Sequence, residues 1–238
     1  MKSISNKVYF IPKDKDTELC IPRPQPSKKY IPDWYKEMPT NVPTIDDLGL
    51  RGTAKRCMPF LDSLVSGYIQ ELPCDVIFEC NTEEEDPVIS YRWAGDYRPL
   101  ATRFETSQAK NSMPHFKGYY KTEFHWNSFW EPKTPSGYST LYFHPANRFD
   151  LPFLTHNGII DTDKWPIHGP LPFILKKGFS GLIPAGTPIY QMIFIKREVW
   201  NSFAADFDEK LVKSKEYSVR RNFEHGYKKI FWSKKEYN

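Results

Sequence analysis

Two carboxylates one residue apart, Asp161 and Asp163, are the first candidates for chemistry in this sequence. His144, His156 and Arg148 lie in the same stretch and could complete a pocket for a nucleotide or a small polar ligand. Imidazole titrates near neutral pH, so the two histidines could act as an acid and a base, or as metal ligands, if they meet in space. The alternative is that each is a structural histidine whose ring nitrogens are satisfied by the fold.

Four short motifs run through residues 135–197: Pro-Ser-Gly-Tyr-Ser-Thr-Leu, His-Pro-Ala-Asn-Arg-Phe-Asp-Leu, Gly-Ile-Ile-Asp-Thr-Asp and Ile-Pro-Ala-Gly-Thr-Pro-Ile-Tyr-Gln-Met-Ile-Phe. Their order resembles the trimeric dUTPase and dCTP deaminase superfamily, with its Pro-Pro-Gly turn, Arg-Ser segment, Gly-Val-Ile-Asp motif and closing Gly-x-x-Ile-x-Gln-Leu strand. The resemblance covers about a quarter of the chain. It implies a β-clip-like core, and it implies the fold more than the reaction.

The resemblance assigns roles to single residues. Asp161 falls where the family keeps the carboxylate that orients or activates the attacking water, and Asp163 is the second acid of that motif. Asn147 and Arg148 occupy the segment that holds phosphates in the family. Trp165 lies one position after the place of the aromatic residue that stacks on the nucleoside.

The sequence also departs from the family pattern. Asn147-Arg148-Phe149 stands in place of Arg-Ser-Gly, and Lys164 stands where the stacking aromatic residue belongs. No Asp or Glu occurs from Lys164 to Arg197, although a deaminase requires a catalytic glutamate after the Ile-Asp motif. An inherited fold without the reaction is therefore one interpretation.

The whole chain is similar to a second family, which has no assigned activity and comes from tailed phages and bacteria. The similarity rests on Ile-Pro-Asp-Trp-Tyr-Lys, Gly-Ile-Ile-Asp-Thr-Asp and Ile-Phe-Trp-Ser-Lys-Lys-Glu-Tyr, in this order, and on a length of about 240 residues. It implies a phage-encoded product that is located in the host cytoplasm or the virion.

Other chemistry is not indicated. The sequence has no phosphate-binding loop, no Gly-x-Gly-x-x-Gly turn, no Gly-x-Ser-x-Gly elbow and no His-Glu-x-x-His helix. The four cysteines are irregularly spaced, which predicts reduced thiols rather than a zinc site. The acidic run 83–86 is typical of a solvated hairpin tip. We therefore expect no metal and no cofactor.

The pattern of apolar residues predicts a mainly β (α+β) domain. Cys74–Cys80 and Pro87–Ala94 read as a hairpin, and several short apolar runs between Tyr138 and Ile195 are punctuated by turn residues. The predicted core is β-clip-like, or a double-layered β-barrel or sandwich. One amphipathic helix is expected near residues 53–72, and a helical segment at the C-terminus.

Three parts are expected along the chain. Residues 1–52 are rich in proline and read as an arm whose aromatic turn, Ile31–Lys36, packs on the body or on a neighbouring subunit. Residues 53–199 form the β-rich core, and residues 200–238 a basic, aromatic helical segment. Within it, residues 210–238 contain nine basic and three acidic residues and so carry a charge of +6.

Two classes of function follow. The first is a non-catalytic binding or assembly protein, a homo-oligomer or a partner of other subunits, whose basic C-terminal segment could also bind nucleic acid. The second is a nucleotide or polar-ligand binder or hydrolase that uses Asp161. A third reading, carbohydrate recognition, requires exposed Trp126, Trp130 and Trp165. No apolar run approaches the roughly 20 residues of a membrane span and no signal peptide is recognisable, so a cytoplasmic location without membrane contact is expected.

Overall fold

The structure is a computed structural model that describes residues 7–44, 49–80, 89–102, 114, 116–165, 169–221 and 226–238. The chain divides into two units, unit 1 with residues 1–27 and 67–197, and unit 2 with residues 28–66 and 198–238. The predicted N-terminal arm contributes to both. Among the described residues, strands account for 35% and helices for 21%, which confirms the mainly β prediction.

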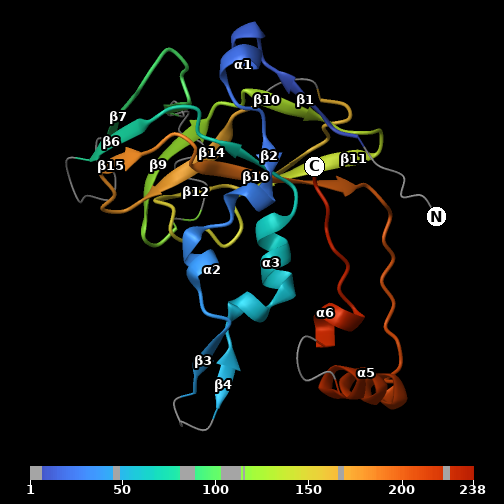
Figure 1. The fold of residues 1–238 in the computed structure, drawn as a ribbon. Coiled ribbons are helices and arrows are strands. Elements are labelled where there is room, and N and C mark those ends of the chain that lie inside the picture. The colour runs from blue at the N-terminus through green and yellow to red at the C-terminus, as the bar shows by residue number, and fades with distance from the viewer. Residues whose placement is uncertain are drawn as a thin grey trace. The chain divides into compact units, whose positions relative to one another are not determined.

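Unit 1 contains almost all of the strands (Figure 1). Its elements in chain order are β1 (Tyr9–Pro12), α1 (Lys15–Cys20), β2 (Gln25–Pro26), β5 (Tyr68–Glu71), β6 (Val76–Cys80), β7 (Ile89–Trp93), β8 (Leu100–Thr102), β9 (Tyr119–Trp126), β10 (Trp130–Lys133), β11 (Tyr138–Phe143), β12 (Phe153–Thr155), β13 (Gly158–Ile160), β14 (Leu171–Lys176), β15 (Gly181–Ile183) and β16 (Pro188–Lys196).

The sheets of unit 1 are antiparallel and open. Their strand orders are β13-β11-β16-β5-β2, β12-β14-β9-β8, β15-β6-β7 and β1-β10. No sheet in the described part of the chain closes on itself, so the barrel form of the predicted core is not what these strands build. The N-terminal residues are part of this structure, because β1 pairs with β10 and β2 pairs with β5.

Aromatic side chains fill the core of unit 1. Trp126 and Phe173 stack with ring centroids 3.7 Å apart, and Phe124 is likewise fully buried. Trp126 Nε1 donates to Thr155 Oγ1 at 3.1 Å, and that hydroxyl donates to the Ile189 carbonyl at 2.6 Å. This relay links β9, β12 and β16 and satisfies the indole N–H in an apolar interior. Phe124 and Trp126 of β9 therefore belong to the core.

The helix expected at residues 53–72 is shorter than predicted. The chain forms η2 (Ala54–Arg56) and α3 (Met58–Val65), and it then becomes strand β5. Gly67 has φ +76°, and a Cβ at this position would lie 1.9 Å from the Met192 carbonyl oxygen. The helix ends here because the backbone must turn and approach β16 closely, which only glycine permits.

The hairpin predicted between Cys74 and Ala94 is confirmed. Strands β6 and β7 pair antiparallel, with Val76 opposite Trp93 and Cys80 opposite Ile89. The acidic run 83–86 lies outside the described residues. The four cysteines are free thiols, as predicted.

Unit 2 is made of short elements and an extended segment. They are η1 (Ser27–Tyr30), α2 (Asp33–Glu37), β3 (Asn41–Pro43), β4 (Leu50–Gly52), η2, α3, α5 (Glu209–Arg221) and α6 (Gly226–Ile230). The predicted aromatic turn is α2, and its Tyr35 ring stacks on Phe60 of α3 at 5.8 Å. This turn therefore packs within its own chain.

The C-terminal helices confirm the predicted helical segment in part. Residues 198–208 are extended rather than helical, and Figure 1 shows this stretch as the long trace that leads into α5. Asp208 Oδ1 accepts from the Leu211 amide at 2.9 Å and so starts the helix. Within the described residues, no helix is long and apolar enough to cross a membrane.

Candidate functional site

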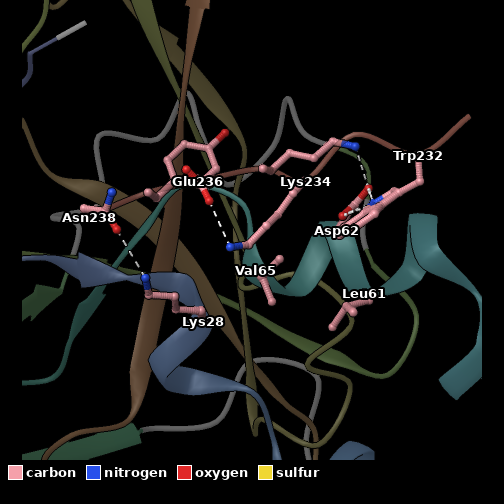
Figure 2. Close-up of a pocket in the computed structure, with 10 residues that line it drawn as sticks. Lys28, Leu61, Asp62, Val65, Trp232, Lys234, Glu236 and Asn238 are labelled. Carbon is pink, nitrogen blue, oxygen red and sulfur yellow. Dashed lines mark hydrogen bonds and ion pairs between the residues drawn. The ribbon is translucent and has the colours of Figure 1, made fainter. Parts of the chain in front are cut away.

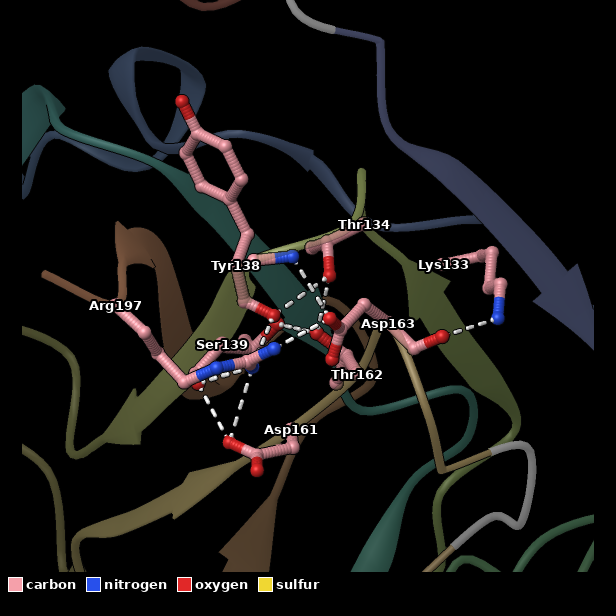
Figure 3. A network of polar contacts seen from close by, with 10 residues as sticks. Lys133, Thr134, Tyr138, Ser139, Asp161, Thr162, Asp163 and Arg197 are labelled. Atoms are coloured by element: carbon pink, nitrogen blue, oxygen red, sulfur yellow. Dashed lines mark hydrogen bonds and ion pairs between the residues drawn. The ribbon is translucent and has the colours of Figure 1, made fainter.

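The turn after β13 carries both predicted carboxylates, and its side chains form hydrogen bonds with residues of other segments (Figure 3). Asp161 Oδ1 accepts a hydrogen bond from Ser139 Oγ at 2.7 Å. The buried Thr162 hydroxyl lies 2.7 Å from that of Thr140 and 2.9 Å from that of Thr134. The turn therefore ties β13 to β11 and to the residue after β10.

Arg197, the first residue after β16, joins the two carboxylates. Its guanidinium donates to Asp163 Oδ2 and lies 3.2 Å from Asp161 Oδ1. The Gly137 amide donates to the same Asp163 oxygen at 2.8 Å, and the Asp163 side chain is only 5% exposed. The hydrogen bond from Arg197 is the main cause that lowers the pKa of Asp163 to about 2.

This network suits a structural clamp better than a general base. A general base works best when its pKa lies near the working pH, and Asp163 is ionised far below neutrality. Asp163 also accepts from two internal donors, Arg197 and Gly137. The Asp161 side chain is 49% exposed, so only this carboxylate keeps the contact with solvent that an attacking water would need.

The loop between β11 and β12 holds a second group of predicted residues. His144 Nδ1 accepts from the Thr155 amide at 3.3 Å, and its Nε2 lies 3.2 Å from the Arg148 carbonyl oxygen. Burial lowers the pKa of His144, in agreement with a neutral ring that accepts at Nδ1 and donates at Nε2. The Arg148 guanidinium pairs with Asp150 at 2.7 Å. Asn147 supplies the left-handed residue of the turn, with φ 58°.

His156 and Trp165 occupy separate environments. The His156 ring lies beside Phe116, with centroids 5.7 Å apart, and its Nδ1 is 3.7 Å from Glu123 Oε1. Trp165 is half-exposed, and its amide donates to the Asp161 carbonyl at 2.9 Å. Trp126 and Trp130 are buried, which leaves the carbohydrate reading with one of its three rings.

The predicted residues thus form two groups rather than one pocket. Asp161 and Asp163 lie near the beginning of β11, because they accept hydrogen bonds from Ser139 and Gly137. The second group, His144, Asn147 and Arg148, follows the end of β11. Ser139 and His144 are five residues apart along the chain, which in a strand is about 16 Å. The convergence that a hydrolytic pocket requires is not seen in the contacts of these residues.

Two residues of these networks were not predicted from the sequence, Arg197 and Glu131. Glu131 of β10 is 4% exposed and accepts from the Tyr142 hydroxyl at 3.1 Å and from Ser128 Oγ at 3.5 Å. Burial raises the pKa of Glu131 to about 7. The long apolar run that forms β16 could have drawn attention to Arg197, the cation that follows it. No pattern in the sequence marks Glu131, because it is a single acid in the four-residue strand β10.

Unit 2 contains a pocket of about 340 Å³ between α3 and the C-terminal residues (Figure 2). Asp62 lines it and accepts from Trp232 Nε1 at 3.0 Å and from Lys235 Nζ at 2.8 Å. Lys234 pairs with Glu236 at 2.9 Å, and Lys28 donates to the Asn238 side chain at 3.4 Å. The charged groups that line the pocket are therefore bonded to other lining residues, and the contacts of Asp62 hold Trp232 and Lys235 against α3.

Large apolar side chains are exposed along the extended segment 198–208. Val199, Trp200, Phe203 and Phe207 are 91%, 82%, 90% and 80% exposed. Among the described residues, the backbone of residues 199–207 makes no hydrogen bond. Exposed apolar patches of this kind mark interaction sites on folded proteins.

The described residues contain no group of three or more His, Cys, Asp or Glu side chains that could hold a metal ion. Neither a protein-family model nor a curated protein matches the sequence.

Proposed function

We propose that the protein is a non-catalytic binding or assembly protein that associates with other protein subunits, its own copies first. One observation carries this proposal, the row of exposed aromatic side chains at Trp200, Phe203 and Phe207. Each such ring removes about 150–250 Å² from water when it is covered, so a protein surface that covers all three gains a large apolar contact. Aromatic residues are also the side chains most enriched in the centres of protein interfaces.

The polar network supports the same conclusion. Asp163 accepts hydrogen bonds from Arg197 and from the Gly137 amide, so this carboxylate is engaged within unit 1 rather than presented to a ligand. The candidate histidines make hydrogen bonds or ring contacts within unit 1.

For the core we propose a β-clip-like arrangement. Its support is that β13, β11 and β16, which carry three of the four motifs of the resemblance, are neighbours in one sheet. The setting that we propose, a phage-encoded product in the host cytoplasm or the virion, is supported by the whole-chain similarity alone.

A second function, nucleotide or polar-ligand hydrolysis at Asp161, is favoured by one observation, the half-exposed Asp161 carboxylate at the motif position. It predicts that Asp161→Asn abolishes binding or turnover of deoxynucleoside triphosphates with an unchanged melting temperature. Calorimetric titration of dUTP and dCTP into wild type and this variant measures it. We expect no binding to either protein.

The test of the assembly proposal is the mass of the full chain by light scattering over a range of concentrations. We expect a mass above that of one chain, and a monomer for the variant Trp200→Ser, Phe203→Ser, Phe207→Ser. The matched control replaces three exposed apolar residues of unit 1, Phe149→Ser, Ile159→Ser and Leu182→Ser, and should keep the wild-type mass. A full chain that is monomeric at every concentration would contradict the proposal.

A further inference from the structure

The extended segment and the helix that follows it carry opposite charge. Residues 198–208 contain three acids, Glu198, Asp206 and Asp208, and no Lys or Arg, so their charge is −3. Helix α5 contains five basic and two acidic residues, so its charge is +3. One chain therefore holds both halves of a charge-complementary pair.

Helix α5 also offers the apolar surface that the segment needs. Leu211 and Val212 are 49% and 41% exposed on adjacent sides of the helix, and every side chain described on this helix, from Glu209 to Tyr217, is exposed. A helix of 13 residues is marginal in water unless packing stabilises one of its faces. Both elements thus present apolar side chains that nothing in the described part of the chain covers.

We infer that the segment 198–208 of one copy lies along helix α5 of a second copy, and that the second copy returns the same contact. This inference rests on the proposed function and names its partner. In a two-fold symmetric dimer the same surface is used twice, so each acidic segment meets a basic helix. The aromatic rings of the segment then pack on Leu211 and Val212, which lie about 100° apart around the partner helix.

The size of such a contact is sufficient for a stable dimer. Three large aromatic side chains bury roughly 450–750 Å² on one segment, and two reciprocal segments bury roughly 900–1,500 Å². A specific protein interface must bury about 1,000 Å². The helix surface covered in return adds to this area.

Charge favours a second copy over nucleic acid as the occupant. Helix α5 alone would attract the phosphates of a nucleic acid. The aromatic residues that would stack on its bases belong to the acidic segment, however, and that segment repels phosphates. A partner that binds both the segment and helix α5 must itself carry an acidic apolar part and a basic part. A second copy of the chain carries both.

The experiment is a charge exchange in the full chain. Variant A carries Lys210→Glu, Lys213→Glu and Lys215→Glu, which changes the helix from +3 to −3. Variant B carries Glu198→Lys and Asp206→Lys, which makes the segment basic and leaves the helix-starting Asp208 in place. The control carries Lys13→Glu, Lys117→Glu and Lys177→Glu on exposed positions of unit 1. Masses are measured by light scattering for each protein alone and for an equimolar mixture of A and B.

We expect dimers for wild type and control, an increase of at least 10-fold in the dimer dissociation constant for A and for B alone, and a heterodimer in the mixture. Dimers that persist in A and B, yet are lost when Trp200, Phe203 and Phe207 are replaced by Ser, would overturn this contact and leave the assembly proposal intact. A monomeric wild type would overturn both. A variant A that stays dimeric but loses binding to a single-stranded oligonucleotide would assign the helix to nucleic acid.

Discussion

The two units use aromatic residues in opposite ways. In unit 1 the rings of Phe124, Trp126 and Phe173 are fully buried and pack on one another. In unit 2 Trp200 and Phe203 are almost fully exposed on an extended segment without backbone hydrogen bonds among the described residues. The same residue type therefore stabilises the fold in one unit and, we propose, contacts another subunit in the other.

A matched pair of substitutions tests this comparison most strongly. Phe124→Ala leaves a cavity in the core of unit 1 and should lower the free energy of unfolding by about 3–5 kcal/mol. Phe203→Ala removes an exposed ring and should change it by less than about 0.5 kcal/mol, measured by urea denaturation at a concentration where the chain is monomeric. Similar losses for both variants would show that Phe203 packs within its own chain.

A glycine pair tests how tightly the strands of unit 1 approach one another. Gly67→Ala places a Cβ 1.9 Å from the Met192 carbonyl oxygen at φ +76°, and should cost about 3 kcal/mol or more. Gly95→Ala has a similar φ of +86° but no atom within 4 Å, so it should cost only about 1 kcal/mol. Chemical denaturation measures both, and equal costs would mean that the contact with β16 is not tight.

Glu131 makes the stability of unit 1 depend on pH. Its pKa is raised from 4.5 to about 7 in the folded protein, so the folded state binds more protons and its stability falls as the pH rises from 4.5 through 7. The loss above pH 8 is on the order of 3 kcal/mol. Glu131→Gln keeps an acceptor for Tyr142 and should remove this loss, which makes the variant more stable than wild type at pH 8.5.

The melting temperatures of the two proteins between pH 4 and 9 measure this effect. Glu131→Gln should flatten the fall between pH 5 and 8. Parallel curves for variant and wild type would show that Glu131 ionises in the folded state without cost.

Much of the fold was predictable from the sequence because it depends on local pattern. The two runs Cys74–Cys80 and Pro87–Ala94 predicted the β6–β7 hairpin, and the short apolar runs between turn residues further along the chain predicted strands. The end of the helix before Gly67 was not predictable, because it depends on a contact with Met192, 125 positions further along the chain. The predicted helix at residues 53–72 was also wrong across β5, because the apolar residues of this strand continue the spacing that is typical of a helix.

Only half of the candidate site could be predicted from the sequence. The Asp-Thr-Asp motif drew attention to Asp161 and Asp163, but their partner Arg197 is set by the register of β16, which places Lys196 opposite Tyr138. Register is a property of the paired strands and cannot be read from either strand alone. The loop residues His144 and Arg148 were close in sequence to the motif, yet the length of β11 keeps them apart from it.

The smallest expected effect separates the two carboxylates. Asp163→Asn removes the charge that holds Arg197, in a side chain that is almost completely buried, and should lower the melting temperature by a few degrees more than Asp161→Asn, whose carboxylate is half-exposed. Because the pKa of Asp163 is lowered to about 2, its contribution is present above pH 4 and disappears as the pH falls towards 2. Thermal denaturation of wild type and both variants at pH 7 and at pH 2.5 measures the difference, which should shrink at the lower pH. A larger loss for Asp161→Asn would mean that the exposed carboxylate, rather than the buried one, holds Arg197 at the end of β16, and the clamp would then have to be assigned to Asp161.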